Sequence, residues 1–365
     1  TLIVDGYKGC VYVNPNQELL SHYKNLKNED NKLIEELLKN NSLPSITQDG
    51  VAISIAVNTG ILSDISLAIH SGAEEIGLYR TEFSFLENSS FPGEQEQELV
   101  YKQVLESFRP NPVTMRTLDV GGDKILPYLP IEEANPFLGW RGIRITLDHP
   151  EIFLIQLRAM IRANISTGNL RILIPMVTTI SEVDSTILLI KQAYQEIADE
   201  GISTPFPKIG VMLEVPSLIY QIKQLSERVD FISIGSNDLI QYLLAVDRNN
   251  ARVSGLYDSL QPSVIQAIQD IVKQSKKYSL PVSICGEMAS DPLAVIVLIG
   301  MGLTSLSMNT ASIPRIKSVI RNITFKQAEQ IFLNTLKMED AQSIKSYLSE
   351  VVENEGLGGL IRAGD

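Results

Sequence analysis

Short runs of apolar and β-branched residues alternate with longer stretches of helical periodicity along most of this chain. Each run is followed by a polar turn and then by a helical pattern, and this rhythm begins at Val51. Such alternation predicts βαβ units and therefore a parallel sheet. The eight strand-like runs are Val51–Val57, Glu75–Tyr79, Val113–Leu118, Arg171–Met176, Ile209–Leu213, Phe231–Ile234, Pro281–Ile284 and Ser305–Met308.

Eight repeats within 365 residues indicate an α/β protein with a closed (β/α)₈ TIM barrel rather than an open sheet. The gaps before the fourth and seventh runs are the longest, so inserted loops or extra helices are expected there. Helices are predicted at Ser63–Ser71, Pro150–Thr167, Ser181–Glu200, Ser217–Ser226, Ser263–Tyr278 and Pro292–Gly300.

Both ends of the chain fall outside this rhythm. Residues 1–14 alternate like strands, and a charged helix is expected at Asn16–Lys39, before a break that ends in Pro44. The last residues, 337–365, predict a helix and a glycine-containing tail. We therefore divide the chain into an N-terminal strand-and-helix linker remnant (1–44), a barrel (45–335) and a C-terminal helix with its tail (336–365).

Composition narrows the class of protein. The chain is 44% hydrophobic and 20% charged, which is ordinary for a soluble globular protein, and no apolar run is long enough to predict a membrane span. With two cysteines and no secretory signal at the start of the sequence, a cytoplasmic location is expected. The net charge of −12 argues against nucleic-acid binding, although buried arginines can still form a pocket for a small anion.

Charged residues follow several of the predicted strands, and barrel active sites form at the carboxyl ends of strands. Arg80 and Arg116 lie at the ends of the second and third runs, and Arg248 lies in a loop after the sixth. Guanidinium groups bind phosphate and carboxylate oxygens in pairs, so three of them at one rim predict an anionic ligand. The alternative is that each arginine pairs with a nearby Asp or Glu and braces the barrel.

Glu214 and Asp238 follow neighbouring predicted strands and are the candidate metal ligands. Mg²⁺ commonly takes one or two carboxylates and completes its octahedron with water and substrate oxygens. A network of arginines and carboxylates without a metal is the alternative. The sequence has no cluster of histidines and cysteines of the kind that zinc requires.

Cys285 follows the seventh predicted strand and has two interpretations. A cysteine in such a strand is commonly a small buried apolar side chain, but at the rim of a barrel it can also exchange a proton. The loop from Gly121 to Lys124 has two interpretations as well, because it can present backbone N–H groups to an anion or be an ordinary turn.

Six blocks of the sequence together resemble enzyme I of the phosphoenolpyruvate (PEP) phosphotransferase system. They occur in the family's order and extend over nearly the whole chain. Two other interpretations stay open: the related barrel of a pyruvate phosphate dikinase or PEP synthase, and a ligand-sensing dimerisation module without turnover. The six blocks are Gly77–Phe83, Arg116–Lys124, Asn135–Arg141, Met212–Pro216, Ser233–Leu239 and Ser283–Ala289.

The resemblance implies a PEP-protein phosphotransferase that binds PEP and Mg²⁺ and transfers the phosphoryl group to a histidine. Glu214 and Asp238 would bind Mg²⁺, and Cys285 would protonate the enolpyruvate carbon once the phosphate has left. The implied substrate ligands are Arg80, Arg116, Asn237, Asp238 and Arg248.

The family carries its accepting histidine in a swivelling domain before the barrel, and residues 1–14 look like the last strands of that domain. We therefore expect this chain to be part of a larger protein. The resemblance also implies a homodimer and a small histidine-containing phosphocarrier protein as the next acceptor. Residues 245–250 and 257–260 look more like the nitrogen-branch paralogue than the sugar-branch enzyme.

Overall fold

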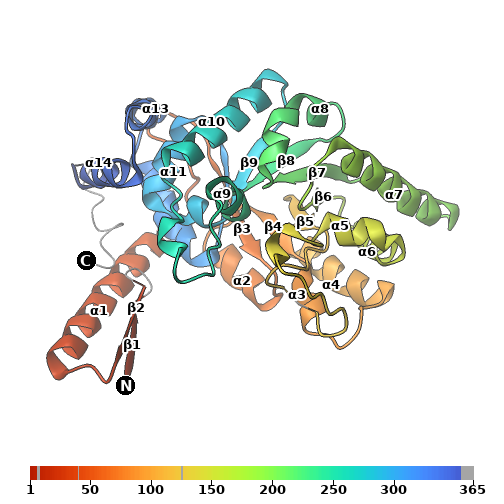
Figure 1. Ribbon diagram of the computed structural model, residues 1–365, viewed down its shortest axis with the longest axis horizontal. Helices are drawn as coiled ribbons and strands as arrows, with labels where there is room; N and C mark the ends of the chain where they lie inside the picture. Colours follow the sequence, from red (N-terminus) through yellow and green to blue (C-terminus); the bar gives the residue numbers. More distant parts are fainter. Residues whose placement is uncertain (6–8, 40, 125, 355–365) are drawn as a thin grey trace.

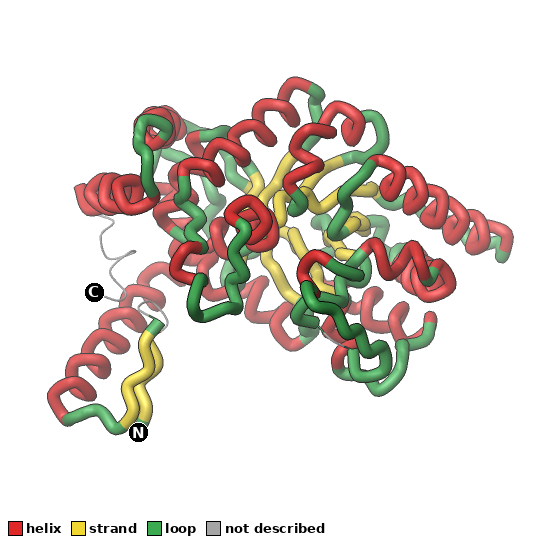
Figure 2. The backbone as a smooth tube through the Cα atoms, viewed as in Figure 1, coloured by secondary structure: helices red, strands yellow, loops and turns green. Residues whose placement is uncertain are grey.

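The centre of the molecule is a closed barrel of eight parallel strands (Figures 1 and 2). The computed structural model describes residues 1–5, 9–39, 41–124 and 126–354. Each barrel strand pairs with the next along the chain, and the last pairs with the first through Ser307 and Ala56, so the predicted (β/α)₈ barrel is confirmed. The strands are β3 (Ser54–Thr59), β4 (Glu75–Arg80), β5 (Val113–Arg116), β6 (Leu170–Ile174), β7 (Lys208–Leu213), β8 (Phe231–Gly235), β9 (Val282–Cys285) and β10 (Ser305–Met308).

All eight predicted strands are present, and the first shows the largest shift at its start. The apolar run was predicted to begin at Val51, whereas β3 begins at Ser54. The three preceding residues instead follow a turn at residues 48–50 and form one side of a short antiparallel bridge, in which Ile46 pairs with Ala52 and the Thr47 N–H bonds to the Val51 carbonyl at 2.9 Å. A β-branched run therefore predicts the strand but cannot separate it from an adjoining extended segment that pairs elsewhere.

Helices surround the barrel, and the two longest gaps hold the expected insertions. A short 3₁₀ turn (Pro136–Leu138) and α5 precede β6, and α9 precedes β9. The helix expected at Ser217–Ser226 begins as a 3₁₀ turn over Pro216–Gln221. The helices are α2 (Ser63–His70), α3 (Glu82–Leu86), α4 (Glu94–Ser107), α5 (Ile143–Asp148), α6 (Pro150–Ala163), α7 (Ile180–Asp199), α8 (Ile222–Ser226), α9 (Ser236–Leu244), α10 (Pro262–Lys277), α11 (Pro292–Gly300), α12 (Ile313–Arg321), α13 (Phe325–Thr335) and α14 (Ala341–Asn354).

The N-terminal segment lies beside the barrel rather than in it (Figure 1). Strands β1 (Leu2–Asp5) and β2 (Cys10–Val13) form an antiparallel pair, and α1 (Gln17–Lys39) leads from them to the barrel. The Tyr23 hydroxyl of α1 donates to Asp5 at 2.7 Å, which joins the helix to the pair. The division of the chain at residues 44 and 335 stays a prediction, and the expected glycine-containing tail lies outside the described residues.

No helix within the described part of the chain combines the length and apolarity needed to cross a membrane. The most apolar helix, α11, is instead enclosed by protein, with every residue from Leu293 to Gly300 buried. Helix α13 covers its outer side, and a β-carbon at Gly300 would lie 2.2 Å from the Ala328 carbonyl oxygen. The two helices therefore approach closely only because position 300 has no side chain.

Gly300→Ala is expected to lower the free energy of unfolding by about 1–3 kcal/mol, because α13 must move away from α11. Urea unfolding followed by circular dichroism measures this loss. Gly255→Ala is the matched control, since a β-carbon at Gly255 meets no atom within 4 Å. Equal stability of the two variants would contradict the close approach.

Candidate active site

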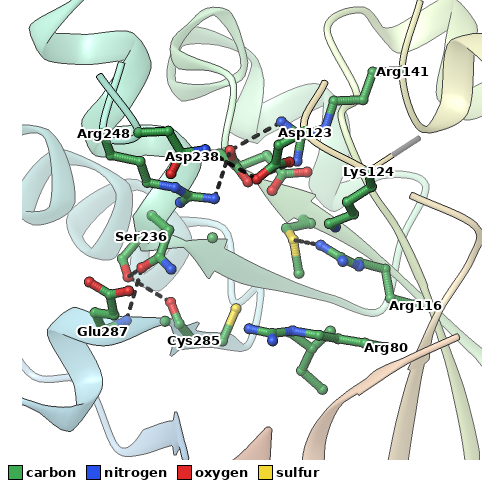
Figure 3. A pocket seen from close by; sticks show the side chains of 17 residues that line it. Arg80, Arg116, Asp123, Lys124, Arg141, Ser236, Asp238, Arg248, Cys285 and Glu287 are labelled. Atoms are coloured by element: carbon green, nitrogen blue, oxygen red, sulfur yellow. Dashed lines mark hydrogen bonds and ion pairs between the residues drawn. The ribbon is translucent and has the colours of Figure 1, made fainter. Parts of the chain in front are cut away.

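A cavity of about 330 Å³ opens at the carboxyl ends of the barrel strands (Figure 3). Arg80 and Arg116 are the last residues of β4 and β5 and are paired in the strand register. In Figure 3 these two arginines enter the cavity from one side and Arg248 from the other. The structure brings every sequence-predicted site residue to this cavity: Arg80, Arg116, Glu214, Asn237, Asp238, Arg248 and Cys285.

The two paired arginines differ in their contacts. Arg116 is only 4% exposed, and its guanidinium donates to Glu82 at 2.5 Å and lies 3.0 Å from an Asp119 oxygen. Its Nε has no hydrogen-bond partner among the described residues. Arg80 is partly exposed, and no hydrogen bond or ion pair joins its side chain to another described residue. The bracing interpretation therefore fits Arg116 in part, whereas the charge of Arg80 has no such protein partner.

A second cationic pair, Arg141 and Lys124, was not among the predicted site residues. Arg141 is 1% exposed and donates to both oxygens of Asp119 at 3.1 and 3.2 Å and to both oxygens of Asp238 at 3.1 Å. Lys124 lies 2.8 Å from Glu82 and 2.7 Å from Asp119. The result is a buried chain of alternating charges that runs from Glu82 to Asp238.

Burial disfavours a charged carboxylate, so the state of Asp119 depends on its neighbours. Arg116, Arg141 and Lys124 outweigh the burial and hold the pKa of Asp119 well below its usual range. The pKa of Asp238 is also lowered, because Arg141 and Arg248 outweigh its burial. Both carboxylates are therefore ionised at neutral pH.

Sequence reasoning missed Arg141 because it lies in the long segment between β5 and β6, far from a strand end. It does belong to one of the six blocks, Asn135–Arg141, and that was the only available signal. The loop from Gly121 to Lys124 fits the interpretation as a turn better than the one in which its backbone binds an anion. The N–H groups of Gly121 and Lys124 bond to each other's carbonyls, so the loop contributes the Lys124 side chain rather than these two backbone donors.

Glu214 is a buried carboxylate that is only half satisfied. It is 1% exposed, and one of its oxygens accepts the Met176 N–H at 2.6 Å. The other oxygen has no hydrogen-bond partner among the described residues. Burial, together with the negative charges of Asp238 and Asp119, raises the pKa of Glu214 to about 8.

These features fit a divalent cation between Glu214 and Asp238. The two side chains follow neighbouring strands β7 and β8, and a β-carbon at Gly235 would lie 2.8 Å from the unpartnered Glu214 oxygen. Within the described residues no group of three or more His, Cys, Asp or Glu side chains is arranged to hold a metal. A site with two carboxylates suits Mg²⁺, which takes its remaining ligands from water and substrate.

Cys285 is buried and yet lines the cavity, so its two interpretations do not exclude each other. Its Sγ lies 3.4 Å from the Ile234 carbonyl oxygen, to which the thiol donates. Burial, aided by the charge of Glu214, raises the pKa of the thiol to about 11 even though Arg116 and Arg80 oppose the shift. The group therefore holds its proton at neutral pH and can act as an acid.

The chain matches the family described as "PEP-utilising enzyme, PEP-binding domain" over residues 35–325. Proteins named "Phosphoenolpyruvate-dependent phosphotransferase system" from Salmonella typhimurium and Escherichia coli K12 are each 47% identical over 100% of this chain and 49% of their own length. The phosphoenolpyruvate-protein phosphotransferase of Haemophilus influenzae is 41% identical over 97% of this chain and 62% of its own length. The chain thus spans about half the length of the first two relatives.

Among solved structures, a citrate lyase from Burkholderia xenovorans LB400 matches with a TM-score of 0.47 and 17% identity, over 86% of this chain and 96% of that chain. This likeness is too weak to bear on function.

The thiol of Cys285 is expected to titrate at about 11 in the folded protein, against about 8.5 for an unperturbed cysteine. A Cys10→Ser variant leaves Cys285 as the single cysteine of the chain, so ¹³C-labelled cysteine gives one Cβ resonance to follow against pH. The same sample in denaturant is the control. A folded-state midpoint at or below the denatured one would contradict the assignment of a protonated resting thiol.

Proposed function

Because this chain belongs to the PEP-utilising enzymes and contains their PEP-binding domain, we propose that its barrel binds PEP and Mg²⁺ and delivers the phosphoryl group to a histidine of a separate domain. One observation carries the proposal. The cavity holds arginine donors and a carboxylate oxygen without hydrogen-bond partners among the described residues, beside a buried network in which Asp119 and Asp238 are paired with Arg141.

The unpartnered donors suit a small ligand with two anionic groups. Arg116 Nε and Arg248 Nη1 are buried without an acceptor among the described residues, and a buried donor left unpaired costs about 1–3 kcal/mol. Oxygens of a phosphate and a carboxylate would accept from both. We assign Arg80, Arg116, Arg248 and Asn237 to PEP, with Asp238 beside it.

The barrel's own residues then have distinct tasks in the reaction. Glu214 and Asp238 would hold Mg²⁺, which supplies charge neutralisation at the phosphoryl oxygens. The arginines bind and orient the ligand. After the phosphoryl group leaves, the Cys285 S–H bond breaks and a C–H bond forms at the enolate carbon, which yields pyruvate and leaves a thiolate near Arg80 and Arg116.

We propose that the phosphoryl group passes from the histidine domain to a small histidine-containing carrier, and that the barrel acts as a homodimer in the cytoplasm. The assignment to the nitrogen branch rests on residues 245–250 and 257–260. The last strands of the histidine domain are assigned to residues 1–14, within which Leu2–Asp5 and Cys10–Val13 form the β1–β2 pair.

Glu214→Gln is expected to remove the Mg²⁺ dependence of PEP binding, because the neutral amide keeps the size of the side chain but not its charge. Titration calorimetry with and without Mg²⁺ should show wild-type binding tightened by the ion, and the variant weakened at least about tenfold in its presence. Asp184→Asn is the matched control, since this carboxylate pairs with Arg228 on the surface. Equal Mg²⁺ dependence in wild type and Glu214→Gln would remove Glu214 from the metal site.

Cys285→Ala is expected to lower pyruvate formation by about 10²–10⁴-fold, the usual contribution of a general acid, while PEP binding is retained. The assay supplies the histidine domain of a full-length relative as a separate protein and measures pyruvate with lactate dehydrogenase. Cys10→Ala, at an exposed cysteine, is the control. Unchanged turnover in Cys285→Ala would rule out this residue as the proton donor.

A further inference from the structure

One polar residue interrupts the apolar face of α6. Gln156 is 1% exposed and lies among the buried Phe153, Leu157 and Met160. A buried amide without hydrogen bonds destabilises the fold because it loses its contacts with water, so a glutamine at this place needs partners. Packing alone does not call for a polar side chain at this position.

Both ends of the Gln156 amide are bonded. Its oxygen accepts the Leu118 N–H at 2.9 Å, just after β5. Its nitrogen donates to the Thr81 hydroxyl at 3.1 Å and to the Tyr101 hydroxyl at 3.2 Å. One side chain on the outer layer therefore contacts the segments that follow both arginine-bearing strands.

Thr81 is the second junction of this chain of hydrogen bonds. It occupies the residue before α3, where a threonine hydroxyl commonly caps the helix, but no capping bond is made. The hydroxyl instead donates to the carbonyl of Arg116 at 2.8 Å. Thr81 follows Arg80 directly, so its side chain ties the backbone of one arginine to that of the other.

The series of hydrogen bonds ends near the start of α4. Tyr101 donates to the Gln97 side chain at 2.9 Å, and Gln97 donates to the Pro92 carbonyl at 2.8 Å. Helices α4 and α6, which carry these residues, lie next to each other outside the barrel in Figure 1. Every donor in the series has an acceptor, so these hydrogen bonds favour a single arrangement of the four side chains.

We propose that this buried series of hydrogen bonds fixes the spacing of Arg80 and Arg116 at the cavity. Gln156 and Thr81 are then positioning residues. The inference rests on the proposed function, in which Arg80 and Arg116 bind PEP. The ladder between β4 and β5 ends at the Arg80–Arg116 pair, and the hydrogen bonds to Thr81 and Leu118 begin where that ladder stops. They hold in place the residues that lie just beyond the ladder between β4 and β5.

The test compares Thr81→Val, which keeps the shape and loses the hydroxyl, with Thr81→Ser, which keeps the hydroxyl. Titration calorimetry with PEP and Mg²⁺ should show Kd raised about tenfold in Thr81→Val, the equivalent of one lost hydrogen bond, and close to wild type in Thr81→Ser. Gln156→Leu should weaken binding similarly. In the double variant Thr81→Val/Gln156→Leu, the loss of affinity should be smaller than the sum of the two separate losses, because both residues act through the same series of hydrogen bonds.

Thermal unfolding of each variant separates positioning from stability. If Thr81→Val lowers the unfolding temperature but binds PEP as tightly as wild type, these hydrogen bonds only stabilise the fold and the inference is overturned. If wild type itself binds no PEP, the proposed function fails and this inference fails with it. Weaker binding in Thr81→Val with rescue in Thr81→Ser supports the positioning role.

Discussion

The guanidinium of Arg141 lies between the carboxylates of Asp119 and Asp238, and the mouth of the barrel depends on that contact. The two acids come from segments on different sides of the mouth, one after β5 and one in the first turn of α9. Removing a charge from water costs several kcal/mol, and each of these three groups is buried. Loss of any one would leave an uncompensated charge, so the three hold the segments in a single arrangement.

Within the described part of the chain, a few groups beside this network have no hydrogen-bond partner. Arg80, the Nε of Arg116, the Nη1 of Arg248 and one oxygen of Glu214 line the same cavity without a hydrogen-bond partner among the described residues. A cavity that leaves donors of three arginines and one carboxylate oxygen unpartnered is suited to an anion bound together with a cation. That division of charge, rather than the net charge of the chain, gives the site its chemistry.

The apolar floor of the cavity contributes to the same chemistry. Leu78, Met212 and Cys285 line the cavity and form a small buried cluster with Leu173. Low polarity there keeps the thiol protonated, and it also strengthens the attraction between arginine and a bound anion. The outer layer acts on the site as well, because the hydrogen bonds of Gln156 reach the ends of β4 and β5 from helix α6.

The sequence by itself determined the eight strands, the barrel and the rim residues. Strand and helix periodicity are local properties, and parallel strands bring their carboxyl ends to one rim wherever they are in the chain. The tertiary structure alone decided which charges are paired. Arg141 reaches Asp238 across 97 positions of sequence, and Arg116 has an ion pair while its neighbour Arg80 has none among the described residues. The buried Gln156 of α6 finds its hydrogen-bond partners in Thr81, Tyr101 and Leu118, which are remote in sequence. Ion pairing and desolvation depend on distances between remote segments, and no local pattern encodes those distances.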